Sequence, residues 1–215
     1  MISVSGVTVE YGDLIAVADV SFQVPPGFVL AVSGPSGAGK SSLLWAIAGA
    51  VAVKAGQVEV DGLVITDRPR AAAHGVVLIP QGNGLARVLT ARENLSMPLL
   101  ADRKPTDEVD RVIEDALTAV GLLDSGDHLV EELSGGEQQR IAVARGIAQQ
   151  GKVILADEST SELDSSNRER VLDLLRTQAD RGAAVIIATH DPTVAEAADG
   201  HVLMDEGRLT WVRRL

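Results

Sequence analysis

Several short runs of apolar residues occur along the chain, and they do not alternate with polar positions. Continuous hydrophobicity over such short lengths is typical of strands that are buried on both faces, as in a parallel sheet covered by helices. The runs are Phe28–Ser33, Val76–Ile79, Val153–Ala156 and Ala184–Ala188. They predict the central strands of an α/β fold.

Helical patterns lie between these runs. From Val109 to Val120 the apolar residues recur with the i, i+3, i+4, i+7 spacing of one helix face, and Gly121 follows as a stop signal. Asp191-Pro192 is typical of a helix start, because a capping residue precedes a proline at the first helical position. Further helices are predicted around Leu43–Ile47, around Ile141–Ile147, and around Val171–Leu175 with an end near Gly182.

Other segments alternate polar and apolar residues, which predicts antiparallel strands with one buried face. These segments are Val4–Tyr11, Val17–Val24 and Gln57–Val60, and Met204–Leu209 has the pattern of a closing hairpin. Residues 83–150 are mostly helical in pattern and separate the second apolar run from the third. We therefore expect one domain over residues 1–215, with a core of residues 1–82 and 151–215 and an inserted helical subdomain of residues 83–150.

Composition excludes several classes of protein. The chain has 215 residues and a formal net charge of −11, which disfavours a protein whose main task is to bind nucleic-acid phosphates. It has no cysteine, which excludes disulfides and cysteine-ligated metals. The start of the chain has no signal-peptide pattern, and the longest uncharged apolar stretch, Ser41–Val53, is too short for a membrane span. We expect a soluble intracellular protein.

The first chemical signal is Gly34-Pro35-Ser36-Gly37-Ala38-Gly39-Lys40-Ser41, which matches G-x-x-x-x-G-K-[ST]. It comes directly after a predicted buried strand and directly before a predicted helix. Glycines let several backbone N–H groups turn toward one anion, the helix N-terminus adds partial positive charge, Lys40 adds a full one, and Ser41 supplies a hydroxyl for Mg²⁺. The segment is predicted to bind phosphate.

Acidic residues follow the third apolar run. Asp157 stands at the strand end, where a carboxylate beside a phosphate loop suits Mg²⁺, and Glu158 is positioned to polarise an attacking water. A structural acidic strand end is the alternative, which the phosphate loop disfavours.

The second and fourth runs also end in polar residues. Gln81 follows the second run and can ligate Mg²⁺ or orient water, although a lone glutamine at such a place is more often an ordinary loop residue. His190 follows the fourth run, at the kind of strand end where open α/β sheets bind ligands, although a lone histidine is more often structural.

The segment Leu133-Ser134-Gly135-Gly136-Glu137-Gln138 opens a predicted helix. Ser134 with Glu137 is a capping box, which explains the helix start. A capping box does not require two consecutive glycines, which leave the helix N-terminus open to a second anion.

Together these motifs resemble the ATP-binding cassette (ABC) family over nearly the whole chain. The LSGGEQ segment is the most specific of them, and the phosphate loop, Gln81, Asp157-Glu158, Ser161-Glu162-Leu163-Asp164 and His190 occur in the family's order and spacing. The resemblance implies a P-loop NTPase core with a mostly parallel sheet, an N-terminal antiparallel β subdomain and an inserted helical subdomain.

The resemblance also implies an ATPase that uses ATP and Mg²⁺ and closes as a head-to-tail dimer with a second copy or a homologous ATPase. In such a dimer Ser134 and Gly136 of one copy contact the γ-phosphate held by Lys40 of the other. The implied catalytic residues are Glu158 as general base, His190 as a γ-phosphate contact and Gln81. The implied nucleotide-binding residues are Tyr11 (stacked on adenine, or else an ordinary surface tyrosine), Gly34, Pro35, Ser36, Gly37, Ala38, Gly39, Lys40, Ser41, Ser42, Ser134, Gly135, Gly136, Gln138 and Asp164; the implied metal ligands are Ser41, Gln81 and Asp157.

The chain departs from the family pattern in places. Ser159 stands where a proline usually follows the glutamate, Glu162 replaces a small residue, and Gly82 and Gly84 replace bulkier residues after Gln81. These departures remove no phosphate ligand, so hydrolysis is expected to survive them.

The expected function is the ATPase subunit of an ABC transporter, located in the cytoplasm on the inner face of the membrane through an integral membrane subunit. The segment Leu89–Leu95 resembles the lipoprotein-releasing and macrolide-export subgroup, which favours export. The alternative is a cassette ATPase that works with a soluble complex, as in iron–sulfur cluster assembly. Nucleic acid is not an expected partner.

Overall fold

The apolar runs become neighbouring strands of one sheet in the computed structural model, which describes residues 1–101 and 105–215. The strand order is β10-β9-β3-β8-β7-β6, and β9, β3, β8, β7 and β6 run parallel. The bounds are β3 Val29–Ser33, β6 Val76–Ile79, β7 Val153–Asp157, β8 Ala184–Thr189, β9 Gly200–Asp205 and β10 Arg208–Arg213. The predicted parallel core is therefore confirmed.

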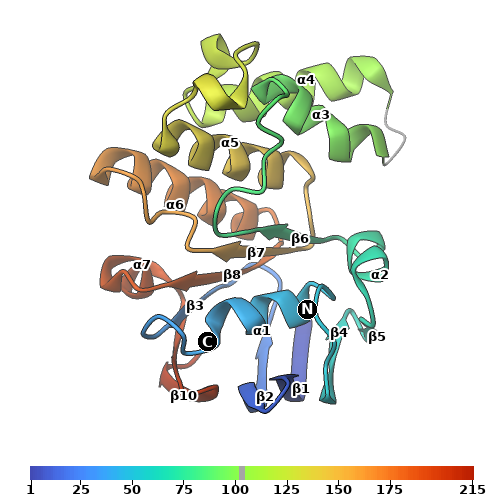
Figure 1. The fold of residues 1–215 in the computed structure, drawn as a ribbon, viewed down its shortest axis with the longest axis vertical. Coiled ribbons are helices and arrows are strands. Elements are labelled where there is room, and N and C mark those ends of the chain that lie inside the picture. The colour runs from blue at the N-terminus through green and yellow to red at the C-terminus, as the bar shows by residue number, and fades with distance from the viewer. Residues whose placement is uncertain (102–104) are drawn as a thin grey trace.

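The alternating segments form a second, antiparallel sheet beside the first (Figure 1). Its order is β2-β1-β4-β5, with β1 Ile2–Tyr11, β2 Leu14–Val24, β4 Ala55–Val60 and β5 Leu63–Val64. The predicted closing hairpin is formed by β9 and β10, but β9 also pairs in parallel with β3. That parallel pairing was not predicted, because β9 buries alternate residues as a strand with one exposed face does.

The predicted helices are present, and two others were not predicted individually. The bounds are α1 Lys40–Ile47, α2 Arg68–Ala73, α3 Ala91–Ala101, α4 Thr106–Ala119, α5 Gly135–Ala148, α6 Ser165–Asp180 and α7 Pro192–Ala197, with short 3₁₀ turns at Leu123–Ser125 and Val130–Glu132. Helix α2 is only six residues long and buries Ala71 alone, and its start is defined by the Asp67 cap and by Pro69 in its first turn. Helix α3 contains Pro98, which interrupts a helical pattern in sequence.

Hydrophobic clusters assemble these elements into layers. Helix α1 packs between the two sheets through Leu43, Leu44 and Ile47. Helices α5, α6 and α7 cover the opposite face of the parallel sheet, and α3 and α4 pack on the outer side of α5 at the top of Figure 1. Helix α5 therefore belongs to both the sheet core and the helical cluster. Within residues 1–101 and 105–215, every helix is too short or too polar to cross a membrane.

The contact between α5 and β6 is close at one glycine. A Cβ atom on Gly146 would lie 2.5 Å from Cγ1 and 2.7 Å from Cδ1 of Ile79, a residue that is almost fully buried. A larger residue here would push the helix away from β6, the strand that leads to Gln81.

We expect Gly146→Ala to lower the free energy of unfolding by about 1–3 kcal/mol, because overpacking outweighs the helix propensity that alanine adds. Urea denaturation measures the change. Combining the substitution with Ile79→Ala removes both clashing atoms, so the double variant should lose less than the sum of the two single losses. A more stable Gly146→Ala protein would contradict this packing.

Candidate nucleotide site

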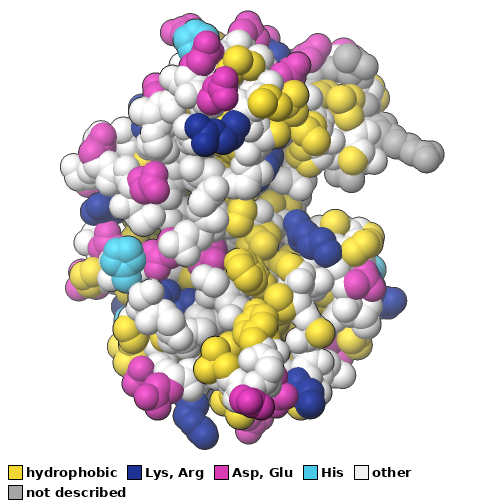
Figure 2. Space-filling view, in the orientation of Figure 1, with side chains coloured by type: hydrophobic (Ala, Val, Ile, Leu, Met, Phe, Trp, Pro, Cys, Tyr) yellow, Lys and Arg dark blue, Asp and Glu magenta, His cyan; other side chains and the backbone are white. Residues whose placement is uncertain are grey.

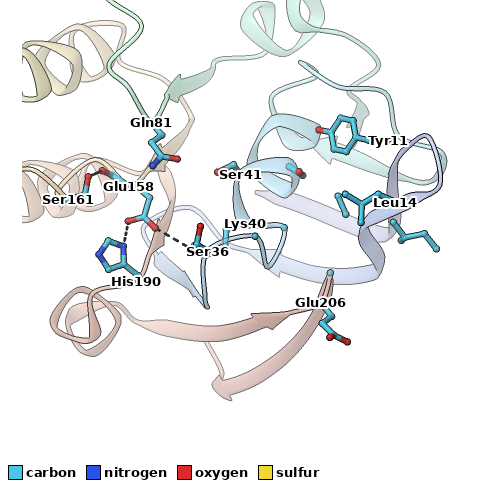
Figure 3. A pocket seen from close by; sticks show the side chains of 16 residues that line it. Tyr11, Leu14, Ser36, Lys40, Ser41, Gln81, Glu158, Ser161, His190 and Glu206 are labelled. Atoms are coloured by element: carbon cyan, nitrogen blue, oxygen red, sulfur yellow. Dashed lines mark hydrogen bonds and ion pairs between the residues drawn. The ribbon is translucent and has the colours of Figure 1, made fainter.

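A cleft of about 950 Å³ lies at the carboxyl ends of the parallel strands and extends to the antiparallel sheet. Figure 3 shows side chains from the glycine-rich loop, the strand ends and the first hairpin turned toward it. The lining residues are Tyr11, Leu14, Ile15, Ala16, Ser36, Gly37, Gly39, Lys40, Ser41, Ser42, Gln81, Glu158, Ser161, His190, Glu206 and Gly207.

The loop between β3 and α1 is shaped by its glycines. Gly39 caps α1 with a φ of +103°, and a Cβ atom there would collide with the carbonyl oxygen of Ala16. No side chain of the described residues caps α1 through a hydrogen bond. The first N–H groups of a helix lack partners within the helix, so this end of α1 is available to an anion.

Lys40 lies at the base of the loop and is buried. Its Nζ donates to the carbonyl oxygens of Gly34 at 2.8 Å and Pro35 at 3.0 Å, and it lies 3.7 Å from Oε1 of Glu158. The ammonium group is thus held inside the loop, facing the cleft and beside an acidic residue.

Glu158 directly follows β7, and its carboxylate contacts both Lys40 and His190. Its Oε2 lies 2.8 Å from Nδ1 of His190, while its Oε1 faces Lys40. The side chain of Glu158 is 10% exposed and that of His190 is 65% exposed. The carboxylate therefore has a nearly dry position at the edge of the cleft, with its imidazole partner on the solvent side.

Asp157, the last residue of β7, is fully buried behind this edge. Within the described residues, neither of its carboxylate oxygens has a hydrogen-bond partner. Burial raises the pKa of Asp157 and Glu158 adds to the rise, while the nearby Ser41 hydroxyl and Lys40 oppose it. A buried carboxylate behind a cleft that is lined by the Ser41 hydroxyl and the Gln81 amide is a donor set that suits Mg²⁺, so Asp157, Ser41 and Gln81 fit this ion.

The loop that begins at Gln81 is attached to α5. Arg145 donates from Nη1 to the carbonyl oxygen of Gly84 at 2.7 Å and from Nη2 to that of Asn83 at 3.0 Å. Gly82, Asn83 and Gly84 all have positive φ, so the small residues at 82 and 84 serve a tight turn. Helix α5 thereby fixes the segment that follows Gln81.

The signature segment lies apart from the cleft. Ser134 caps α5: its Oγ accepts from the N–H of Glu137, and its own N–H and hydroxyl donate to the Glu137 carboxylate, which lowers the pKa of Glu137. Asp164 caps α6, and the N–H of Asn167 lowers the pKa of Asp164. Both caps place polar groups on the surface.

The structure thus brings together only part of the predicted set. Tyr11, Gln81, Glu158, His190 and most of the glycine-rich loop line one cleft, with Asp157 buried behind it. The described residues that line this cleft do not include Ser134, Gly135, Gly136, Gln138 or Asp164. One chain does not bring its signature segment to its own cleft.

Several lining residues were not predicted. Leu14, Ile15 and Ala16 come from β2, and Glu206 and Gly207 come from the β9–β10 turn. Their sequence pattern is that of an ordinary strand and an ordinary hairpin turn, so no local signal marks them. They reach the cleft because the hairpin turn packs on the loop, where the N–H of Gly207 donates to the carbonyl oxygen of Ala38 at 3.0 Å.

Comparison with known proteins decides the family. The model of a family described as "ABC transporter" matches residues 17–161. The chain belongs to the ABC transporter family. Its fold class is that of the family's ATPase cassette, it is an ATPase, and it uses ATP with Mg²⁺.

The relatives and solved structures that resemble this ABC ATPase are ATP-binding subunits and isolated cassettes. It is 34% identical to a glutamate transport ATP-binding protein of Corynebacterium glutamicum, over 96% of this chain and 88% of that one. It is 36% identical to a hemin import ATP-binding protein of Pseudomonas entomophila, over 96% and 83%. A dimeric ATP-binding cassette in a post-hydrolysis state with ADP and phosphate superposes with a TM-score of 0.90 and 28% identity, over 100% of both chains.

The raised pKa of Asp157 predicts that this carboxylate destabilises the ligand-free fold near neutral pH but favours the binding of Mg·ATP. A carboxyl whose folded pKa is raised stabilises the fold below its unfolded pKa, near 3.8, and that stability is lost as the pH rises through the folded value. Above about pH 4, Asp157→Asn should therefore become progressively more stable than the wild type without ligand, by a few degrees in melting temperature near neutrality. Mg·ATP should reverse the order, because it stabilises the wild type more.

Thermal melts across pH, with and without Mg·ATP, measure both effects. Asp173→Asn is the matched control, because Asp173 is exposed on α6. If the melting temperatures of the wild type and Asp157→Asn depended on pH in the same way, burial of the ionised Asp157 would not be destabilising.

Proposed function

We propose that this ABC ATPase is the energising subunit of a membrane transporter, in which two cassettes close head to tail around two ATP molecules. The separation of the signature segment from the cleft supports this proposal most directly. The cleft supplies Lys40 and Glu158, whereas Ser134 and its two glycines lie on another surface. A second copy, or a homologous ATPase, would complete the site by placing its own signature segment against this cleft.

Within the cleft, we assign the nucleotide to the glycine-rich loop and its base to Tyr11. The N–H groups at the start of α1 and the Lys40 ammonium would bind the phosphates, replacing the contacts that Lys40 makes with the loop carbonyls. Tyr11 is 44% exposed at the end of β1, so its ring face is free for stacking.

Hydrolysis would use Glu158 as the general base. Its position at the end of a buried strand, nearly dry and beside His190, keeps the carboxylate oriented toward the cleft. His190 would turn from Glu158 to the terminal phosphate, and Gln81 would orient the attacking water. Mg²⁺ held by Asp157, Ser41 and Gln81 neutralises phosphate charge when it is bound.

Across the dimer, Ser134, Gly135, Gly136 and Gln138 would meet the partner's nucleotide. The two glycines leave the N-terminus of α5 without side chains, which lets an anion approach the first N–H groups. Asp164 lies in the loop next to this surface and would face the opposite copy. Loss of the terminal phosphate after hydrolysis would remove the contacts that hold the dimer closed.

The helical subdomain of residues 83–150 would dock the membrane subunit. Val88, Met97 and Leu100 are 75%, 57% and 51% exposed, although their neighbours Leu95 and Leu99 are fully buried. Figure 2 shows apolar side chains gathered in the recess beneath the helical part. Exposed apolar residues that gather on a surface are typical of a protein interface. Docking there would place the chain on the inner face of the membrane.

The direction of transport belongs to the membrane subunit, which binds the cargo. Leu89–Leu95 resembles an export subgroup, whereas relatives of this chain are named import ATP-binding proteins. We therefore propose coupling to transport without assigning a cargo to this subunit.

The role of Glu158 is tested by Glu158→Gln. Loss of the base should slow ATP turnover by roughly 10²–10⁴-fold while ATP binding persists. Because ATP is then not cleaved, the variant should accumulate as a dimer in Mg·ATP, which sedimentation velocity detects. Glu169→Gln, an exposed acid on α6, is the control with the same charge change.

Near-normal turnover of Glu158→Gln would remove Glu158 as the base. Lys40→Ala should instead abolish nucleotide binding, so its failure to dimerise separates a binding defect from a catalytic one. A Glu158→Gln protein that binds ATP and stays monomeric would contradict head-to-tail closure.

The membrane partner is tested by affinity purification from detergent-solubilised membranes. The tagged chain should retain an integral membrane protein with several spans, and Met97→Glu with Leu100→Glu should lose it while keeping ATPase activity in solution. Leu123→Glu, at another exposed leucine, should keep it. Retention of a soluble iron–sulfur scaffold in place of a membrane protein would overturn the transporter role in favour of cluster assembly.

A further inference from the structure

The backbone of Glu158 adopts an unusual conformation. Its φ is +48°, in the left-handed region that residues with a side chain rarely adopt, immediately after the extended strand β7. Such a conformation is strained and persists only where the surrounding structure holds it. Here it turns the chain so that the buried Asp157 is followed by a carboxylate that faces the cleft.

Hydrogen bonds fix both ends of this residue. Its N–H donates to the carbonyl oxygen of Ala188 on β8 at 3.0 Å. Its carbonyl oxygen accepts from Nε2 of Gln139 at 2.9 Å and from Oγ of Ser161 at 3.0 Å. Ser161 belongs to the same turn, whereas Gln139 reaches in from helix α5.

The amide of Gln139 also holds the far end of the turn. Its Oε1 accepts from the N–H of Glu162 at 3.1 Å, and the side chain is 6% exposed. One partner is an acceptor and the other a donor, so the carboxamide has a single workable orientation. A glutamate here would turn an oxygen toward the carbonyl of Glu158, and a methionine would offer no hydrogen bond to either group.

We propose that Gln139 is a positioning residue for ATP hydrolysis: its carboxamide locks the turn from Glu158 to Glu162 and so holds the base in its left-handed conformation. The inference rests on the proposed role of Glu158. Gln139 lies on the helix whose N-terminus Ser134 caps, so the same side chain ties the signature helix to the loop that carries the base. A shift of either element is thereby transmitted to the other.

The variant that tests this role is Gln139→Met, which keeps the length of the side chain and removes both hydrogen bonds. We expect the dissociation constant for Mg·ATP to stay within about twofold and turnover to fall by about tenfold or more, because a small misplacement of a catalytic group is costly. Gln149→Met is the matched control: Gln149 follows the same helix at its other end, and its Nε2 donates to the carbonyl oxygen of Arg145 at 2.9 Å. It should keep near-normal turnover.

The decisive readout is a double-mutant cycle with Glu158→Gln, using single-turnover cleavage of radiolabelled ATP. A residue that acts through the base has nothing to position once the base is gone, so Gln139→Met should lower the residual rate of Glu158→Gln by less than twofold. A merely structural glutamine would lower the rate by the same factor in both backgrounds, and that result would overturn the proposal. Near-normal turnover of Gln139→Met would also overturn it.

Ser161→Ala keeps the inference testable if Gln139→Met does not fold. It removes a hydroxyl donor to the same carbonyl oxygen from a more exposed position. It should slow turnover in the wild-type background by a smaller factor and leave the rate of Glu158→Gln unchanged; equal losses in both would count against the locked turn. Near-normal turnover of the single variant Glu158→Gln is a separate outcome. It would overturn the assignment of Glu158 as the base, and with it the role proposed for Gln139.

Discussion

The carboxyl ends of the parallel strands β3, β7, β8 and β6 meet along one edge of the sheet, and polar groups gather there that the sheet itself does not satisfy. β3 leads into the glycine-rich loop, β7 ends in Asp157, β8 leads to His190 and β6 leads to Gln81. Parallel strands force this arrangement, because every crossover helix returns the chain to the opposite edge. The chemistry of the protein depends on this shared edge.

The charged groups at this edge contact one another and the backbone of the loop. Lys40 donates to the carbonyl oxygens of its own loop and faces Glu158, while Glu158 contacts His190. Among the described residues, the buried Asp157 carboxylate has no hydrogen-bond partner, and a divalent cation would offset the cost of its burial. The site therefore presents preformed positive charge, a dry carboxylate and an unsatisfied ligand group, and binding can exchange internal contacts for phosphate contacts.

Helix α5 connects the separate parts of the molecule. Its apolar residues pack into both the sheet core and the helical cluster. Its N-terminus carries the signature segment, Gln139 contacts the turn after β7, and Arg145 contacts the turn after β6. In the proposed dimer this helix would be a physical route by which partner and nucleotide influence each other, because it contacts the turn that carries Glu158, contacts the loop after Gln81 and begins at the exposed signature segment.

The sequence alone determined the parts that depend on near neighbours along the chain. Unbroken apolar runs predicted β3, β6, β7 and β8, alternation predicted β1, β2 and β4, and the G-x-x-x-x-G-K-S and LSGGEQ motifs identified the loop, the signature and the family. These signals are local because burial on one or both faces and the requirements of a turn are properties of successive residues. The short polar α2 and the proline-containing α3 lack such a signal.

Only the tertiary structure decided which distant groups meet. It placed β9 beside β3, brought Leu14 and Gly207 to the cleft and set the amide of Gln139 between Glu158 and Glu162. The residues in each of these contacts are ordinary in their own segments. These contacts depend on strand order and on helix packing. The same local patterns are compatible with several strand orders and packings, so they do not predict the contacts.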